Sequence, residues 1–330
     1  MDFKNKKVLV TGADGFIGSH LAERLVLEGA RVRVFCFYNS QGSVGWLETV
    51  APEIRSELDV QLGDIRDSRY VEQACKDVEV VFHLAALIAI PYSYIATESF
   101  VDTNIRGTLN VLEGVRRAGV KRMVHTSTSE VYGTPTSVPI RETHPLNAQS
   151  PYAATKIAAD QLVLSYFQSF ATPVMVLRPF NTFGPRQSTR AVTQTMLVQL
   201  LAGKKEISLG RLDTRRDLTY VSDVVDGFMR AGSTPGVEGK VIQLGTGRSV
   251  SIGELFNMAC HMLGVTATVV EDSRRLRPDA SEVLELQSDP SRALEFLGWR
   301  PTVRLEEGLE RTASWLRDNR DSYLADFLYV

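Results

Sequence analysis

Five residues in two short runs have the types and spacing of a hydride-transfer site with an added acid/base group. Thr128, Ser129 and Glu130 are consecutive, and Tyr152 and Lys156 follow four residues apart. Residues four apart lie on one face of a helix, so a phenol and an ammonium would lie side by side. Oxidation and reduction need only the Thr, the Tyr and the Lys. Glu130 is therefore the group that predicts a further chemical step.

The residues before Tyr152 predict the start of a helix. Ser150 is a favourable N-cap residue and Pro151 a favourable first helical residue, which sets Tyr152 in the first turn. The positive helix end and the nearby ammonium both favour the phenolate, so we expect a lowered pKa for Tyr152, suited to a general base. Taken alone, such a pair could also be a surface tyrosine and a solvated lysine.

A glycine motif near the N-terminus predicts a dinucleotide site. Gly12, Gly15 and Gly18 follow a β-rich run directly and open a helix that extends to Leu27. In that context, glycines let the backbone approach a pyrophosphate held at the helix N-terminus. A Gly-rich turn that only closes a βα unit is the alternative.

The residues that usually select between NAD and NADP favour neither cofactor in this sequence. NAD-selective folds usually end the second strand with Asp or Glu, which binds the ribose 2′-hydroxyl. Here the strand ends in Phe37 to Ser40, without a carboxylate, and no Lys or Arg follows before Arg55 to bind a 2′-phosphate. We therefore expect NAD or NADP, with Asp64 and Ile65 bracketing the adenine.

The order of segments predicts the fold class. Short β-rich runs alternate with helical periodicity in the first half, which indicates an α/β fold with a Rossmann-type doubly wound parallel sheet and a crevice at the carboxyl ends of its strands. After Pro179 we expect a smaller C-terminal substrate-binding lobe. The expected division gives 1–178 with about 217–247 to the NAD(P)-binding domain, and 179–216 with 248–330 to the substrate domain. The expected strands are Lys7 to Thr11, Val32 to Phe37, Val60 to Leu62, Val78 to Leu84, Arg122 to Ser127, Val174 to Arg178 and Val241 to Leu244.

Composition and charge limit the classes of partner. The 330 residues are 44% apolar, enough for one large domain or two lobes that share a cleft, and the net charge of -2 is spread along the chain. Such a chain offers no sustained field for nucleic acid or an anionic membrane. Three widely separated cysteines suit a reducing cytoplasm, and no apolar run is long enough to span a bilayer. We expect a cytoplasmic protein with a small-molecule partner and no metal site.

Nearly the whole chain resembles the extended short-chain dehydrogenases/reductases, and among them the nucleotide-sugar epimerases, dehydratases and decarboxylases. The residues that carry this resemblance are Thr11 through Gly18, His83 to Ala86, Asn104 with Gly107 and Thr108, Ser127 to Gly133, Tyr152 to Lys156, Arg178 to Pro185, Arg216, Asp217, Tyr220, Val221, Asp223 and Leu297 to Trp299 with Pro301. Four further stretches are most similar to 4,6-dehydratases of legionaminic acid pathways, which act on a nucleotide-linked N-acetylglucosamine. These stretches are Phe35 to Ser40, Ala85 to Tyr94, Asn147 to Tyr152 and Asn181 to Arg190.

The resemblance implies a nucleotide-sugar 4,6-dehydratase whose NAD or NADP stays tightly bound and is recycled. The cofactor would take a hydride from sugar C4 while Tyr152 removes the O4 proton, with Thr128 on the same oxygen and Lys156 on the nicotinamide ribose. Glu130 would then remove the C5 proton and help water to leave C6. Hydride return to C6 would give a 4-keto-6-deoxy sugar.

The residue before Glu130 keeps other reactions open. Some dehydratases of this family have Asp at that position as a dedicated acid, whereas this chain has Ser129. The order Thr, Ser, Glu resembles both GDP-mannose dehydratases and UDP-glucuronate decarboxylases, and a 4-epimerase or a non-catalytic NAD(P)-binding sensor are further alternatives. Glu130 itself could also be a solvated loop carboxylate or a group that orients Tyr132.

The resemblance also implies binding residues and a homodimer. The implied cofactor-binding residues are Gly12, Asp14, Gly15, Phe16, Ile17, Gly18, Phe37, Asn39, Ser40, Asp64, Ile65, Leu84, Ala85, Ala86, Thr126, Tyr152, Lys156 and Pro179. The implied substrate-binding residues are Ile88, Asn181, Arg186, Arg216 and Arg277. Arg suits a diphosphate because its planar fork donates two hydrogen bonds, although most Arg side chains are simply solvated. The dimer helices would be roughly Ser93 to Ala118 and Tyr152 to Phe170, whose apolar faces could equally be internal core.

Overall fold

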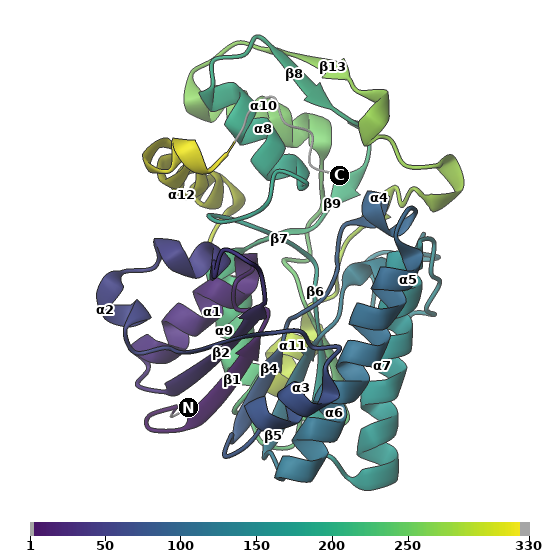
Figure 1. The fold of residues 1–330 in the computed structure, drawn as a ribbon. Coiled ribbons are helices and arrows are strands. Elements are labelled where there is room, and N and C mark those ends of the chain that lie inside the picture. Colours follow the sequence, from purple (N-terminus) through teal and green to yellow (C-terminus); the bar gives the residue numbers. More distant parts are fainter. Residues whose placement is uncertain (1–2, 324–330) are drawn as a thin grey trace.

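A seven-stranded, all-parallel sheet forms the larger part of the molecule (Figure 1). The computed structural model describes residues 3–323. The strand order is β11-β6-β5-β4-β1-β2-β3, so the winding reverses between β1 and β4. This is the predicted Rossmann-type doubly wound topology, and the reversal opens a crevice at the carboxyl ends of β1 and β4. The strands are β1 (Lys7–Thr11), β2 (Arg31–Phe37), β3 (Asp59–Gly63), β4 (Val80–His83), β5 (Arg122–Thr126), β6 (Val174–Pro179) and β11 (Val241–Leu244).

All seven predicted strands are present. β1 and β11 have the predicted bounds, and β11 pairs with β6 in parallel, which confirms that this late segment returns to the first lobe. The strands read as nearly continuous apolar runs because helices cover both faces of the sheet. Val8, Val10 and Phe82, for example, are fully buried.

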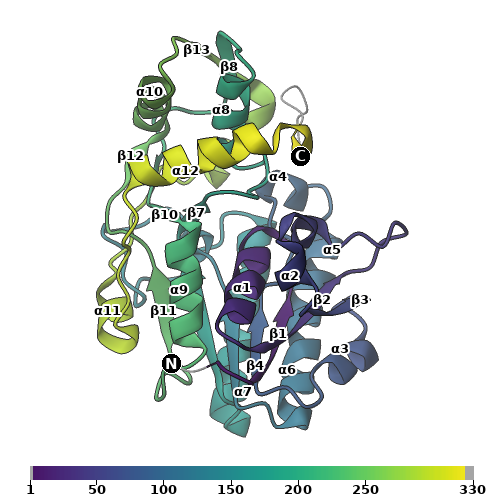
Figure 2. The same ribbon diagram turned by 90° about the vertical axis from the view of Figure 1, so that its left-hand side faces the viewer.

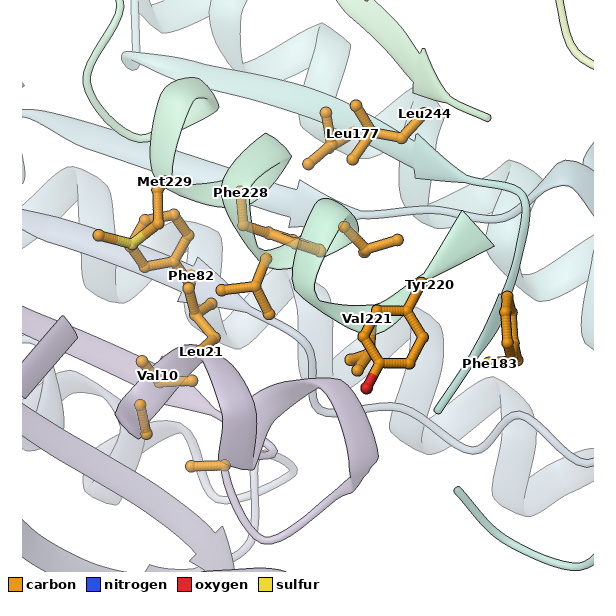
Figure 3. Packing of buried hydrophobic residues seen from close by; sticks show 14 of the residues in the cluster. Val10, Leu21, Phe82, Leu177, Phe183, Tyr220, Val221, Phe228, Met229 and Leu244 are labelled. Atoms are coloured by element: carbon orange, nitrogen blue, oxygen red, sulfur yellow. The ribbon is translucent and has the colours of Figure 1, made fainter. Parts of the chain in front are cut away.

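Two hydrophobic cores lie on the two faces of the sheet. On one face, Val10, Phe82 and Leu177 of the strands pack toward Leu21 and Phe228 of the covering helices (Figure 3). The helices on this side are α1 (Phe16–Leu27), α9 (Val221–Ala231) and α11 (Ser291–Leu297). The other face is covered by α3 (Ser68–Ala74), α6 (Gly107–Ala118) and α7 (Pro151–Phe170).

A smaller group of elements lies at the end of the sheet from which β7 leaves β6 (Figures 1 and 2). Because β7 follows β6 directly, this is the carboxyl end of the strands. The helices there are α8 (Val192–Leu201), α10 (Ile252–Leu263) and α12 (Leu305–Asp318). The short strands are β7 (Asn181–Phe183), β8 (Glu206–Leu209), β9 (Arg215–Arg216), β10 (Leu218–Tyr220), β12 (Val250–Ser251), β13 (Thr268–Glu271) and β14 (Glu285–Leu286). Short helices in both parts of the molecule include η1 (Gly45–Thr49), α2 (Pro52–Arg55), η3 (Ser129–Tyr132), η4 (Ser273–Arg275), η5 (Asp279–Ser281) and η6 (Arg320–Ser322).

The segment expected as one dimer helix, Ser93 to Ala118, is interrupted. It consists of the end of α4 (Ile90–Ser93), α5 (Thr97–Phe100), the π-helical segment η2 (Val101–Arg106) and α6. The π turn contains Asn104, whose buried side chain bonds both backbone groups of Leu87 and the hydroxyl of Thr155. These tertiary bonds fix Asn104 inward, and π turns commonly occur where a helical side chain is fixed in this way.

Among residues 3–323, no helix is both long and apolar enough to cross a membrane.

Candidate active site

The predicted catalytic residues meet at the carboxyl end of β5. Thr128 is the N-cap of η3, where its hydroxyl accepts a hydrogen bond from the Glu130 amide at 3.2 Å. The same hydroxyl is close enough to the Tyr152 phenol to lower its pKa. Ser150 caps α7 by accepting from the Ala153 amide at 3.1 Å, so Tyr152 lies in the first turn as predicted.

Lys156 is held beneath this group. Its Nζ donates to the backbone oxygen of Thr126 at 2.7 Å. Burial lowers the pKa of Lys156 to about 8, although the Asp160 carboxylate opposes this. Lys156 is therefore a buried cation, not the solvated surface lysine that its sequence alone allowed.

The expected low pKa of Tyr152 is not found. Burial raises the pKa of the phenol, and the charges of Glu130 and Asp160 raise it further, while only the Thr128 hydrogen bond lowers it. The prediction was wrong because it counted the helix end and the ammonium but omitted desolvation and two carboxylates. Burial and these charges together favour the protonated phenol.

Glu130 is neither solvated nor bonded to Tyr132. Its side chain keeps 12% of its exposure and its Oε2 lies 3.4 Å from the Arg277 guanidinium. Tyr132 instead donates to Gln243 and accepts from Arg178. Glu130 is thus a nearly buried carboxylate close enough to Tyr152 to affect its pKa.

Two arginines from the C-terminal half surround this carboxylate. Arg216 is nearly buried and lies 3.3 Å from Glu282. The charges of Glu130 and Arg277 both affect its pKa. Burial lowers the pKa of Arg216, while Glu130 raises it. Burial lowers the pKa of Arg277, but the charges of Glu130 and Glu282 raise it, and the net shift is upward. The structure therefore places Arg216 and Arg277 close to the candidate acid/base group, Glu130.

The loop that contains Arg277 is bonded to the first lobe. Gln149 donates to the backbone oxygen of Ala280 at 2.9 Å, and the Tyr94 hydroxyl bonds Ser281 at 2.6 Å. Ser281 also donates to the Gln149 oxygen. These bonds place the loop directly over the residues that precede α7.

The other three predicted substrate residues have different surroundings from Arg216 and Arg277. Arg186 pairs with Glu23 of α1 at 3.0 Å and lies 3.5 Å from Ser19, so its contacts give its predicted diphosphate role no support. Asn181 has a buried Oδ1 with no hydrogen-bond partner among the described residues. Buried polar atoms are rarely left unpaired, so this oxygen is suited to a ligand donor. Ile88 is 63% exposed beside the loop that follows β4.

The glycine motif fits a dinucleotide. Gly12 has φ +70°, and a Cβ there would lie 2.7 Å from the Ala85 nitrogen; a Cβ on Gly18 would lie 2.1 Å from the Gly12 oxygen. Gly15 is the N-cap of α1 and no side chain caps this helix. The free amides of the first turn are therefore available to a pyrophosphate. Phe16 and Ile17 follow in that turn, half-buried.

Other predicted cofactor residues lie at or just after the carboxyl ends of the strands. Leu84 and Ala85 are bonded to Thr11 at the end of β1, and Ala86 follows them. Thr126 has a buried hydroxyl oxygen without a partner among the described residues, and Pro179 is the last residue of β6. Ile65 packs against Gly107. Exposed residues at the end of β2, such as Phe37 and Ser40, flank the opening.

Asp64 and Asn39, two of the predicted cofactor residues, have side chains that bond neighbouring protein groups. Asp64 forms a bidentate pair with Arg66, which lowers the pKa of the carboxyl. Asn39 donates to the oxygens of Phe37 and Ser43 and accepts from two amides of its own loop. Asn39 therefore stabilises the loop, and its side chain has no group left for a ribose.

The sequence analysis missed Asp160. This fully buried carboxylate accepts from Ser127 at 2.7 Å and from Arg178 at 2.8 Å, and lies 3.4 Å from His125. Burial alone would raise the pKa of Asp160, but these partners hold it below its usual range. The signal was available: Tyr152, Lys156 and Asp160 are spaced four apart on one face of α7.

No group of three or more His, Cys, Asp or Glu side chains within residues 3–323 is arranged to hold a metal ion.

Comparisons with known proteins agree with this geometry. The sequence profile of the GDP-mannose 4,6-dehydratase family matches residues 9–312. The UDP-glucose 4-epimerase of Mycolicibacterium smegmatis is 34% identical over 94% of this chain and 99% of its own length. The dTDP-glucose 4,6-dehydratase of Streptomyces antibioticus is 33% identical over 95% of this chain and 93% of its own. The structure of the dTDP-glucose 4,6-dehydratase DesIV from Streptomyces venezuelae, solved with NAD bound, is similar with a TM-score of 0.84 and 30% identity, over 96% of this chain and 98% of that chain.

Proposed function

Since the chain belongs to the GDP-mannose 4,6-dehydratase family of nucleotide-sugar dehydratases and epimerases, we propose that it is a nucleotide-sugar 4,6-dehydratase. Its cofactor is NAD(P). When bound, the oxidised cofactor accepts a hydride from sugar C4, returns it to C6, and favours the Tyr152 phenolate by its positive charge. The observation that carries the proposal is the nearly buried Glu130 carboxylate beside Tyr152.

Tyr152 and Thr128 act on the sugar O4. Thr128 lies close enough to the phenol to lower its pKa, so a sugar oxygen bound between the two hydroxyls would be oriented by Thr128 and would lose its proton to Tyr152. Lys156 and Asp160 lie below on the same face of α7. The Lys156 ammonium is positioned to bind a ribose hydroxyl of the cofactor.

Glu130 performs the step that separates dehydration from oxidation. Oxidation at C4 makes the neighbouring C5 hydrogen acidic. Glu130 removes this proton and donates it to the C6 hydroxyl, which leaves as water, and C5 takes up a proton when the hydride returns to C6. Ser129 is buried and not acidic, so no second carboxylate precedes Glu130 in the loop. Glu130 then serves as both base and acid, with the Arg277 guanidinium 3.4 Å from its carboxylate.

The substrate proposed is a nucleoside diphosphate N-acetylglucosamine, linked to GDP or UDP. Arg216 and Arg277 supply the cationic forks for its diphosphate, and Asn181 supplies an unpaired acceptor. We assign the cofactor to residues 1–178 with about 217–247, and the nucleotide sugar to 179–216 with 248–330. This division follows the elements that carry the two groups of residues.

A 4-epimerase is the second candidate, because a relative with 34% identity has that name. An epimerase would use Thr128, Tyr152 and Lys156 and leave Glu130 without a chemical step. A UDP-glucuronate decarboxylase is the third, since its C4 oxidation would be the same and carbon dioxide would leave in place of water.

Product analysis distinguishes the three reactions. The purified protein is incubated separately with GDP- and UDP-N-acetylglucosamine, UDP-glucose and UDP-glucuronate, and products are analysed by mass and by NMR. A 4-keto sugar lighter by one water supports the dehydratase. Inversion at C4 without a mass change would favour the epimerase, and loss of carbon dioxide from the uronate the decarboxylase. Tyr152→Phe is the matched inactive control, and turnover that survives in it would contradict the assignment of the base.

A homodimer through α7 and the segment from α5 to α6 is part of the proposal. Phe170 of α7 is 56% exposed, and Val101 and Leu109 of the neighbouring segment are 42% and 36% exposed. Burial of such side chains would favour association. Light scattering with Val101→Glu tests it: we expect a dimer that the charged variant shifts to monomer, and a monomeric wild type would contradict the dimer.

A further inference from the structure

We propose that Asp14 replaces the carboxylate missing from the end of β2 and makes the cofactor site selective for NAD over NADP. The inference rests on the proposed function only in that the glycine motif holds NAD(P). It concerns a residue of the glycine loop, whereas the usual determinant is the last residue of the second strand.

Asp14 lies between Gly12 and Gly15, yet its carboxylate reaches the end of the neighbouring strand. Oδ2 accepts a hydrogen bond from the Phe37 amide at 3.3 Å, and Phe37 is the last residue of β2. The carboxylate therefore lies at the place where a strand-borne acid would bind the ribose diol. Asp14 is only partly buried, so a ligand can reach it.

The following loop fixes the position of Asp14. Gly45 has φ +58°, and a Cβ there would lie 2.5 Å from the Asp14 backbone oxygen and 3.1 Å from the Asp14 Cβ. The Trp46 amide donates to the same backbone oxygen at 3.0 Å. The loop thus packs directly on Asp14 and leaves its backbone little freedom.

Other candidates for ribose recognition have competing contacts. The amide of Asn39 uses both donors and its acceptor within the loop. Glu48 accepts from the Ser43 hydroxyl at 2.7 Å and from the Val44 amide at 3.1 Å. Asp14, by contrast, accepts from backbone amides alone, and a carboxylate has room for several further donors.

The charges around Asp14 disfavour a 2′-phosphate. Burial raises the pKa of Asp14 and the amides of Phe37 and Asp14 lower it, and no Lys or Arg contributes. Arg33 of β2 and Arg66 after β3 have carboxylate partners of their own: Arg33 pairs with Asp59 at 2.7 Å, and Arg66 pairs with Asp64 at 2.5 Å. A 2′-phosphate would therefore meet an unpaired carboxylate, and a like-charge contact of this kind lowers affinity by roughly 100-fold or more.

Binding of the two dinucleotides tests the inference without sugar turnover. Protein freed of retained nucleotide is titrated calorimetrically with NAD+ and with NADP+, as wild type, Asp14→Asn and Glu48→Gln. The amide oxygen introduced by Asp14→Asn would keep the acceptor for Phe37, and the thermal midpoint checks that the fold is retained. We expect wild type to prefer NAD+ by roughly 100-fold. Asp14→Asn should lower NAD+ affinity by about 10-fold and raise NADP+ affinity, whereas Glu48→Gln should leave the ratio unchanged.

The nucleotide that wild type retains through purification gives a second measurement, which needs no variant. Release by heat should yield NAD. Retained NADP, equal affinities in wild type, or an unchanged ratio in Asp14→Asn would each overturn the role of Asp14. A wild type that binds neither dinucleotide would contradict the proposed function as well, while selective NAD+ binding without turnover of any sugar would contradict the proposed function alone.

Discussion

At the scale of single residues, the site brings together side chains that are distant in sequence. Glu130 lies beside Arg277, and Tyr152 beside Thr128. In the proposed reaction this arrangement would separate two tasks: the Thr128 and Tyr152 hydroxyls would act on the O4 proton, and the Glu130 carboxylate on the C5 proton. Removing one charge should therefore stop the second task and spare the first.

For Glu130→Gln we expect C4 oxidation to continue while dehydration slows by about 100-fold or more, the usual contribution of an acid/base group. Gln has the same shape but cannot take the C5 proton. Reduced cofactor should then accumulate. Its absorbance near the end of a single turnover measures this accumulation. Ser129→Ala is the control and should dehydrate at nearly the wild-type rate. Equal rates of product formation in wild type and Glu130→Gln would remove Glu130 from the mechanism.

Asp160 is a positioning residue for Lys156. It opposes the burial that lowers the pKa of Lys156 to about 8, and it neutralises the buried Arg178. Asp160→Asn should lower the Lys156 pKa further and reduce the unfolding free energy by about 3 kcal/mol, because Arg178 loses its buried partner. Activity requires the ammonium, so its alkaline limb should begin at lower pH in the variant.

The measurement is the pH profile of kcat together with urea unfolding. A merely structural role for Asp160 would lower stability without moving the profile. Asp160→Glu keeps the charge, so it should recover part of the profile, and a profile identical in all three proteins would contradict the positioning role.

At the scale of elements, local sequence signals predicted only the features that neighbouring residues determine, such as the start of a helix. Ser150 and Pro151 predicted the start of α7 correctly, because capping depends on residues next to each other in sequence. The π turn at Asn104 was not predicted, since bonds to Leu87 and Thr155 produce it. For the same reason the pairing of Glu130 with Arg277, 147 residues away, could not be predicted from either motif.

The cap of α7 gives a prediction at this scale. Ser150→Ala removes the acceptor for the Ala153 amide and should cost about 1 kcal/mol of unfolding free energy. Because Tyr152 lies in the same turn, kcat should also fall. Ser251→Ala is the matched control: Ser251 caps α10 by the same kind of bond, so a similar loss of stability should leave kcat unchanged. Equal kcat in both variants would show that the cap does not position Tyr152.

At the scale of the whole molecule, aromatic side chains connect η1 with α12, two elements far apart in the sequence. Trp46 of η1 lies with its ring centroid 5.7 Å from that of Trp315 in α12 and 5.5 Å from that of Tyr323. In Figure 2, α12 crosses the molecule above α1 and α2. The same η1 residue bonds Asp14, so the C-terminal helix supports the loop beside the glycine motif.

Trp315→Ala should lower the unfolding free energy by about 1–3 kcal/mol, because the ring is partly buried and packs on two others. It should also speed dissociation of the dinucleotide, since the loop on Asp14 loses support. Stopped-flow displacement measures this rate. Trp315→Phe keeps an aromatic contact and should recover most of both effects. An unchanged dissociation rate in Trp315→Ala would show that α12 stabilises the fold without acting on the cofactor loop.

Buried histidines make the fold sensitive to acid. His83 and His125 are fully buried, with ring centroids 5.5 Å apart, and His83 Nδ1 bonds the Thr11 hydroxyl at 2.7 Å. Burial lowers the pKa of His125 from 6.5 to about 4 and that of His83 well below its usual value. Between those values the unfolded chain binds protons that the folded protein does not, so folded stability is present above pH 6.5 and is lost as the pH falls toward 4.

Each such histidine should contribute a slope of up to about 1.4 kcal/mol per pH unit. Urea unfolding between neutral pH and the His125 midpoint measures the total slope. His125→Gln should reduce that slope by one proton even where the substitution also lowers the absolute stability, because the slope counts protons and not contacts. His261 is exposed on α10, so His261→Gln should leave the slope unchanged. If His125→Gln kept the wild-type slope, acid unfolding would have to arise from groups other than this buried pair.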